Sequence, residues 1–71
     1  MIRLDDLEAF VAIVEAGGQS VAARRLGRSL QSVAPALATL ESASGVQLIR
    51  RNTRRSQPTE AGRAFLLRVA P

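Results

Sequence analysis

The chain has 71 residues and contains no cysteine, histidine, tryptophan or tyrosine. This length suits one small domain, which buries only about 60% of the surface of its unfolded chain. Without cysteine or histidine the chain lacks the usual zinc ligands and any thiol chemistry. No paired acids, nucleophile or metal cluster supports catalysis, so we expect a protein that is not an enzyme and uses no cofactor.

The net charge of +4 is unevenly distributed, and all ten basic residues are arginine. Residues 1–23 carry a net charge of −3, whereas residues 24–71 carry +7. Such asymmetry indicates a surface turned toward a polyanion, with a solvated arginine-rich surface as the alternative. Because Phe10 and Phe65 are the only aromatic residues, stacking on single strands is disfavoured and duplex DNA is the better candidate. No apolar run approaches the roughly 18 residues of a membrane span and no signal peptide opens the chain, so we expect a cytoplasmic protein.

The first predicted helix follows Asp5, which with Glu8 three residues later resembles a capping box. Gly17 and Gly18 are expected to end it, because glycine readily adopts the left-handed conformation found after a helix. Its apolar stripe has the helical spacing i, i+3, i+4, i+7 and consists of Leu7, Phe10, Val11 and Val14.

A second short helix is predicted at residues 21–26, with Ser20 as its cap and Gly27 as its end. A third helix opens at Ser29 or Ser32 and ends at Gly45. Its buried stripe is predicted to be Leu30, Val33, Leu37 and Leu40.

The energetic cost of Pro35 depends on where this third helix begins. After a cap at Ser32 it would lie in the first turn, where its missing N–H costs nothing. After a cap at Ser29 it would lie in the helix interior and remove the bond to the Gln31 carbonyl. Because Leu30 is in phase with Val33, we expect a helix from about residue 30 with a kink near Pro35.

The spacing of Ala23, Gly27 and Val33 is typical of a helix-turn-helix. Such a motif needs a small residue where its helices cross, a glycine in the turn and an inward branched side chain. An ordinary corner between two helices remains the alternative for these three residues.

A β-hairpin is predicted next, with Val46, Leu48 and Ile49 in one strand and residues 56–58 in the other. Four arginines lie between the strands, where they could lie along DNA phosphates or enter a minor groove. A solvated charged loop is the alternative. Thr59 is expected to cap a last helix. Together these elements predict a mainly α winged helix-turn-helix with a three-helix core, a short β-hairpin wing and a C-terminal linker helix. The winged helix-turn-helix would span residues 1–58, and residues 59–71 would begin the linker or dimerisation helix.

Several stretches of the chain resemble the N-terminal DNA-binding domain of LysR-type transcriptional regulators. They are LDDLEAFVAIVE at residues 4–15, AARRL at 22–26, LE at 40–41, GVQL at 45–48 and RRNTRRSQPTEAG at 50–62. The resemblance implies that the third helix lies in a DNA major groove while the wing touches the minor groove. It also implies that the last helix continues as a linker helix and pairs with its twofold mate. Relatives carry a much longer C-terminal effector domain, so we expect this chain to be a fragment or truncated product.

The family's contact positions fall on Leu30, Gln31, Ser32, Ala34 and Pro35 of the reading helix and on Arg54 of the wing. The sequence departs from the family at Ala34 and Pro35, where serine and arginine are usual, and neither side chain can donate a hydrogen bond. Arginines of the second helix, turn and wing could supply phosphate contacts. The predicted DNA-binding residues are Ser20, Arg24, Arg28, Ser29, Gln31, Ser32, Pro35, Arg51, Arg54 and Arg55.

The last helix is more apolar than one buried stripe requires, so we expect it to form a homodimer through Phe65, Leu66 and Val69. A helix that only closes the domain's own core is the alternative.

For the whole chain, the favoured function is a duplex DNA-binding module of a transcriptional regulator. The second is a protein-interaction module that uses the uncharged face of residues 31–42. The salt dependence of binding distinguishes the two functions, because binding through phosphate contacts weakens steeply as the salt concentration rises, whereas apolar association does not.

Overall fold

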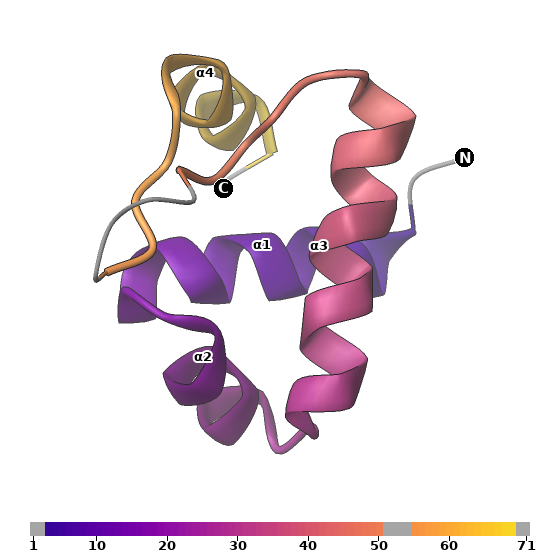
Figure 1. Ribbon diagram of the computed structural model, residues 1–71, viewed down its shortest axis with the longest axis vertical. Coiled ribbons are helices and arrows are strands. Elements are labelled where there is room, and N and C mark those ends of the chain that lie inside the picture. The colour runs from indigo at the N-terminus through magenta and orange to yellow at the C-terminus, as the bar shows by residue number, and fades with distance from the viewer. Residues whose placement is uncertain (1–2, 51–54, 70–71) are drawn as a thin grey trace.

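Helices account for most of the fold, as the sequence predicts. The structure is a computed structural model that describes residues 3–50 and 55–69, without the side chain of Val69. Its helices are α1 (Leu4–Ala16), α2 (Gln19–Leu26), α3 (Leu30–Ser44) and α4 (Glu60–Val69). In Figure 1, α1 crosses the middle of the molecule, α2 and the start of α3 lie at one end, and α4 lies at the other.

Glycine follows each of the first three helices, which confirms their predicted C-terminal ends. Gly17, Gly27 and Gly45 follow α1, α2 and α3 with φ angles of 80°, 66° and 76°. These angles lie in the left-handed region, where a side chain costs energy and glycine does not.

The predicted starts of α1 and α2 are wrong. Arg3, not Asp5, is the N-cap of α1, and no side-chain cap bond forms there, so the capping box with Glu8 is absent. Helix α2 begins at Gln19 with Gly18 as its N-cap, which places Ser20 inside the first turn. In both helices the first hydrogen bond goes to the backbone carbonyl of the N-cap residue, and no side chain caps the helix. Leu7 N donates to the Arg3 oxygen at 3.2 Å, and Ala22 N donates to the Gly18 oxygen at 3.1 Å.

Helix α3 begins where the phase of its apolar residues predicts. Ser29 is the N-cap, although its hydroxyl makes no cap bond, and Leu30 is the first helical residue. The helix continues through Pro35 to Ser44 without interruption. Leu30 is 44% exposed, so its predicted place in the buried stripe is wrong. It is the first residue of α3 and lies beyond the side chains that bury Val33.

The core lies between α1, α2 and α3, and α1 is rotated relative to the prediction. Ala9, Phe10 and Ile13 are fully buried, whereas the predicted Leu7, Val11 and Val14 are only half-buried against the edge of the core. Small side chains explain the rotation, because alanine allows neighbouring helices to approach closely. The other core residues are Ala12, Ala22, Ala23, Val33, Ala36, Leu37, Leu40, Leu48 and Ile49.

The predicted hairpin is reduced to one antiparallel bridge between Ile49 and Pro58. Arg50 N donates to the Gln57 oxygen at 2.8 Å, and Thr59 N donates to the Leu48 oxygen at 3.0 Å. The strands predicted on either side do not form in the described residues. On the Thr59 side the pairing has no room to continue, because α4 begins at the next residue.

The carboxylate of Glu41 holds this bridge against α3. It accepts bonds from Leu48 N at 2.7 Å and from Ile49 N at 3.2 Å, at a position where Glu41 itself is buried. Hydrogen bonds to a charged partner are the stronger ones in proteins, and these two satisfy backbone groups that lie beneath the surface.

Helix α4 is fixed to the same segment by Thr59 and Gly62. The Thr59 hydroxyl accepts a bond from Gly62 N at 2.9 Å, which confirms the predicted cap, and donates to the Gln47 oxygen at 2.6 Å. Gly62 is buried against Leu48, and a Cβ atom there would overlap the Leu48 carbonyl oxygen and lie 3.0 Å from its carbon.

Replacing Glu41 with alanine should lower the free energy of unfolding by roughly 2–4 kcal/mol, because two buried N–H groups lose their charged acceptor. Glu41→Gln keeps one acceptor oxygen and should lose less. Urea unfolding of both variants measures this, with exposed Ser42→Ala as the control. An unfolding free energy of Glu41→Ala within about 0.5 kcal/mol of the wild type would contradict the anchoring role.

Gly62→Ala should destabilise the domain by about 1–3 kcal/mol, because the new methyl group overlaps backbone that cannot move aside cheaply. Helix propensity alone predicts the opposite, a gain of up to about 1 kcal/mol. Thermal unfolding decides between them, and Gly18→Ala is the control because nothing lies within 4 Å of its added Cβ. A raised melting temperature for Gly62→Ala would show that α4 does not pack as described.

Candidate nucleic-acid interface

The turn between α2 and α3 has the geometry of a helix-turn-helix. Gly27 reverses the chain, and Arg28 N donates to the Ala23 oxygen at 2.9 Å, as in a Schellman motif. Ala23 is buried where the helices cross, and Val33 is buried beneath the turn. The three residues that predict the motif therefore take their expected places.

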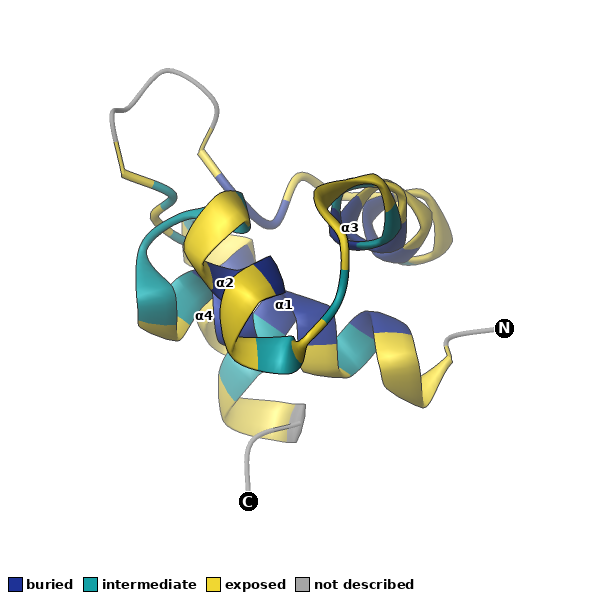
Figure 2. Ribbon diagram, turned by 90° about the horizontal axis from the view of Figure 1, so that it is seen from below, coloured by how far each residue is buried: buried dark blue, intermediate teal, exposed yellow. Residues whose placement is uncertain are grey.

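An uncharged strip runs along the outer side of α3. Gln31, Pro35, Ala38 and Ser42 are exposed, and their spacing places them on one helix face. Figure 2 looks at the end of the molecule where α2 and the first turn of α3 meet, and both helices present exposed residues outward while burying those that face α1.

Arg28 is fixed by hydrogen bonds instead of standing free in solvent. Its Nε donates to the Ser32 hydroxyl at 2.8 Å, and Nη2 donates to the Ser32 carbonyl at 3.3 Å. Nη1 donates to the Asp5 carbonyl at 3.2 Å. The guanidinium therefore links the start of α1 to the first turn of α3, and both predicted DNA-binding residues, Arg28 and Ser32, have contacts within the protein.

Exposed arginines flank this region. Arg24 and Arg25 lie on α2, and Arg50 and Arg55 are the described residues next to the wing segment 51–54. The wing is tied to the end of α1, because Ser56 N donates to the Gly17 oxygen at 2.9 Å. The predicted Ser20 and Ser29 are exposed at the starts of α2 and α3, whereas Arg51 and Arg54 lie outside the described residues.

The Arg55 guanidinium packs against the turn that ends α1. A Cβ atom at Gly17 would lie 2.7 Å from Arg55 Nη2, so glycine at this position serves the left-handed turn and the close approach of Arg55 together. The contact places one wing arginine beside the start of α2.

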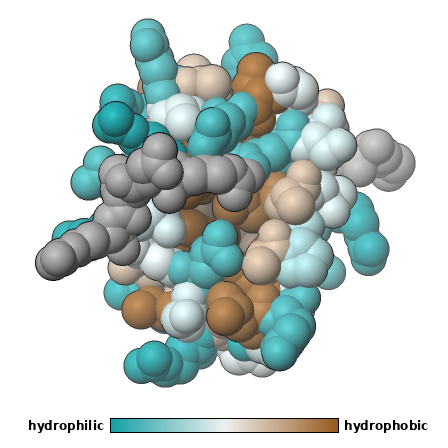
Figure 3. Space-filling view, viewed as in Figure 1, coloured by the Kyte–Doolittle hydropathy of each residue, from teal (hydrophilic) through white to brown (hydrophobic). Residues whose placement is uncertain are grey.

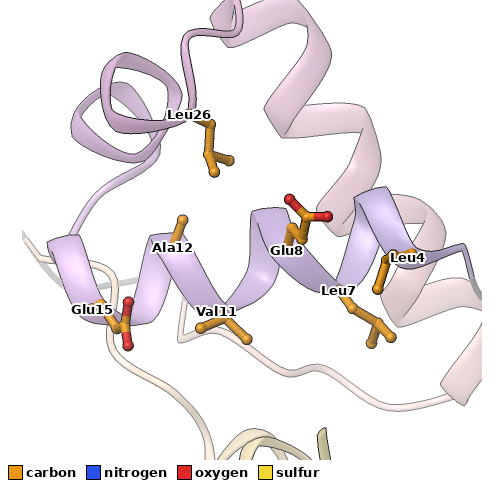
Figure 4. A pocket seen from close by; sticks show the side chains of 7 residues that line it. All are labelled: Leu4, Leu7, Glu8, Val11, Ala12, Glu15 and Leu26. Carbon is orange, nitrogen blue, oxygen red and sulfur yellow. The ribbon is translucent and has the colours of Figure 1, made fainter. Parts of the chain in front are cut away.

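An open groove of about 320 Å³ lies between α1 and the end of α2. Figure 4 shows Leu26 of α2 facing Ala12 and Glu8 of α1, whereas Leu7 and Val11 lie on the opposite edge of α1. Glu8 and Glu15 are exposed at its rim, and two carboxylates there repel phosphate. This charge makes the rim of the groove unfavourable for contact with a phosphate backbone.

Helix α4 contributes to the core with one side and exposes the other. The Phe65 ring packs edge-to-face on Phe10 with centroids 5.7 Å apart, and Leu66 is half-buried against the core. Leu67 is 83% exposed, and sequence reasoning did not single it out. Of the predicted dimer residues, two are thus partly engaged within the domain, and the side chain of Val69 lies outside the described part.

The structural roles of three residues were not predicted from the sequence. Glu41 was noted only as part of a family motif, and the Arg28–Ser32 pair was assigned to DNA. The spacing i, i+4 of Arg28 and Ser32 is the one signal that could have indicated their contact.

Across the described ranges no group of three or more acidic, histidine or cysteine side chains could hold a metal ion, and no helix has the length and hydropathy to cross a bilayer.

The model of the bacterial regulatory helix-turn-helix proteins of the lysR family matches residues 4–63. This chain belongs to the lysR family. A relative in Mycobacterium leprae, described as a probable hydrogen peroxide-inducible genes activator, is 53% identical over 63 residues, which cover 89% of this chain and 20% of the relative. The chain thus spans about one fifth of the length of this relative.

Solved structures of lysR-family domains share the fold. The crystal structure of a complex of the CbnR DNA-binding domain with DNA has a TM-score of 0.87 and 36% sequence identity, covering 93% of this chain and 76% of that one. The complex of the BenM DNA-binding domain with catB site 1 DNA has a TM-score of 0.88 and 30% identity, covering 93% and 73%. The chain is therefore a lysR-type helix-turn-helix domain with the winged-helix architecture predicted from its sequence.

Proposed function

We propose that this domain binds duplex DNA, with the first two turns of α3 in the major groove and the wing at the minor groove. The observation that carries the proposal is an uncharged, exposed α3 face between arginines of α2 and of the wing base. An α-helix fits the major groove, and arginines beside it would neutralise phosphates on either side. The two solved relatives in complex with DNA support the same use of the fold.

The domain would act as one half of a homodimer paired through α4. Leu67 is the exposed large apolar side chain that this helix offers among the described residues, and burial against a partner would remove it from water. Phe65 and Leu66 already pack against the core of the domain and would hold α4 in position beneath the interface. Two reading helices would then meet one side of a duplex about one turn apart, or further with bending.

Selection of this chain from a randomised duplex library at near-physiological salt tests the proposal. We expect an interrupted palindrome to be enriched, because two copies related by a twofold axis read inverted half-sites. Failure to retain any duplex would overturn the proposal and favour the protein-contact alternative for the α3 face.

Arginine variants should differ in the salt dependence of binding. Arg24→Ala should reduce the slope of log affinity against log salt by about 1, since one phosphate contact is lost. Arg28→Ala should weaken binding without changing the slope, because its guanidinium is bonded to Ser32 and Asp5. Titrations of a labelled duplex at several salt concentrations measure both slopes. A drop of about 1 for Arg28→Ala would show that this residue contacts phosphate after all.

A further inference from the structure

The segment that returns from the wing to α4, residues 55–59, is bonded on both of its sides. Ser56 N donates to the Gly17 oxygen at the end of α1, at 2.9 Å. On the other side, Arg50 N donates to the Gln57 oxygen at 2.8 Å. Figure 1 shows this returning segment in orange, running from the end of α1 toward α4. It is therefore attached to α1 as well as to the segment that leads into the wing.

Apolar burial contributes little to the position of the returning segment. Residues 55–57 are polar, with Arg55 and Gln57 exposed and Ser56 half-buried. On the face of the molecule shown in Figure 3, hydrophilic residues separate the hydrophobic ones into small areas. Two short antiparallel segments are only marginally stable by themselves in water. The position of the returning segment therefore depends on its polar contacts with α1.

Arg55 makes a second contact at the same end of α1. A Cβ atom at Gly17 would lie 2.7 Å from Arg55 Nη2, 2.9 Å from Nε and 3.2 Å from Cζ, so one edge of the planar guanidinium faces the turn. Helix α1 has no basic residue in its own last turn. Because the C-terminal end of a helix carries a partial negative charge, a cation is favourable there. Arg55 supplies that cation from a distant part of the chain.

We infer that Arg55 is a positioning residue, which holds the returning segment on the end of α1 and so fixes the wing relative to the helix-turn-helix. The inference rests on the proposed binding of duplex DNA, and it gives Arg55 a role other than the phosphate contact predicted from the sequence. Helix α2 begins at Gln19, two residues after Gly17, so the turn that Arg55 contacts leads directly into the helix-turn-helix. Phosphate contact beside the wing segment would then fall to exposed Arg50.

Two duplexes isolate the contribution of the wing to binding. One is the duplex enriched by selection, and the other is shortened at both ends so that it lacks the minor groove that the wing would contact. The wild type should bind the long duplex about tenfold more tightly, the effect of about one charge-assisted contact. Arg55→Ala should bind both duplexes as weakly as the wild type binds the short one. Arg63→Ala, an exposed arginine of α4, is the control and should keep the tenfold difference.

Two further variants separate the charge of Arg55 from its position. Arg55→Lys keeps a positive charge that could meet a phosphate but lacks the planar guanidinium, so it should behave as Arg55→Ala does. Gly17→Ala should do the same, because the added methyl group would displace the guanidinium. Gly45→Ala is its matched control: Gly45 has a similar left-handed φ, but nothing lies within 4 Å of an added Cβ atom. It should bind the long duplex with the wild-type preference.

Amide hydrogen exchange tests the position of the returning segment without DNA. The Ser56 N–H is bonded to Gly17, so loss of the Arg55 contact should make local opening easier and raise its exchange rate. We expect exchange about tenfold faster in Arg55→Ala, Arg55→Lys and Gly17→Ala than in Gly45→Ala. The amide of Leu40, which is fully buried in the core, should exchange at the wild-type rate in both Arg55 variants.

The outcomes separate this inference from the proposed function. Wild-type affinity of Arg55→Lys for the long duplex would make Arg55 a phosphate contact, and unchanged exchange of Ser56 in the Arg55 variants would also overturn the inference. Equal affinity of the wild type for the long and short duplexes would contradict a role of the wing in binding while leaving binding through α3 intact. Loss of all duplex binding would overturn the proposed function, and the exchange of Ser56 would then decide whether Arg55 holds the returning segment.

Discussion

The structure depends on how one residue, Leu48, is held from three sides. Its N–H donates to the Glu41 carboxylate of α3, its carbonyl accepts from Thr59 at the cap of α4, and its side chain is fully buried. Gly62 lets α4 approach that same carbonyl. The end of α3, the base of the wing and the start of α4 thus meet at one peptide segment. In a domain this small, with a marginal core, such a polar anchor is a large part of the total stability.

A second junction sets the direction of α3. Gly27 turns the chain in the left-handed conformation, and Arg28 then reaches both Ser32 and the Asp5 carbonyl. The reading helix is therefore braced against the start of α1. This junction uses the Ser32 hydroxyl as an acceptor, and exposed Gln31 lies beside it in the first turn of α3.

Some features could be predicted from the sequence because they depend on local chemistry. Gly17, Gly27 and Gly45 end helices through their own backbone freedom, and the Thr59 cap needs only a hydroxyl three residues before an N–H. The order of elements follows from those stops.

Features that depend on distant neighbours were not predicted. The inward face of α1 was misjudged because small Ala9, not larger Val11, lies where α1 packs against the core. The role of Glu41 could not be inferred without knowing that residues 48 and 49 cross beside it. The uneven charge predicts a polyanionic partner, but which arginine side chains are exposed depends on how the helices pack. Arg28 is bonded to Ser32 and to the Asp5 carbonyl, whereas Arg24 is exposed.

We propose that the exposed first two turns of α3 form the DNA-binding surface. Titration of the isotope-labelled chain with the selected duplex, followed by amide NMR shifts, tests it most directly. We expect the largest changes in amide shift at Gln31, Ala34 and Ala38, smaller changes at Arg24 and little change at Glu8. Changes centred on the groove beside Glu8, with the α3 amides unaltered, would contradict it.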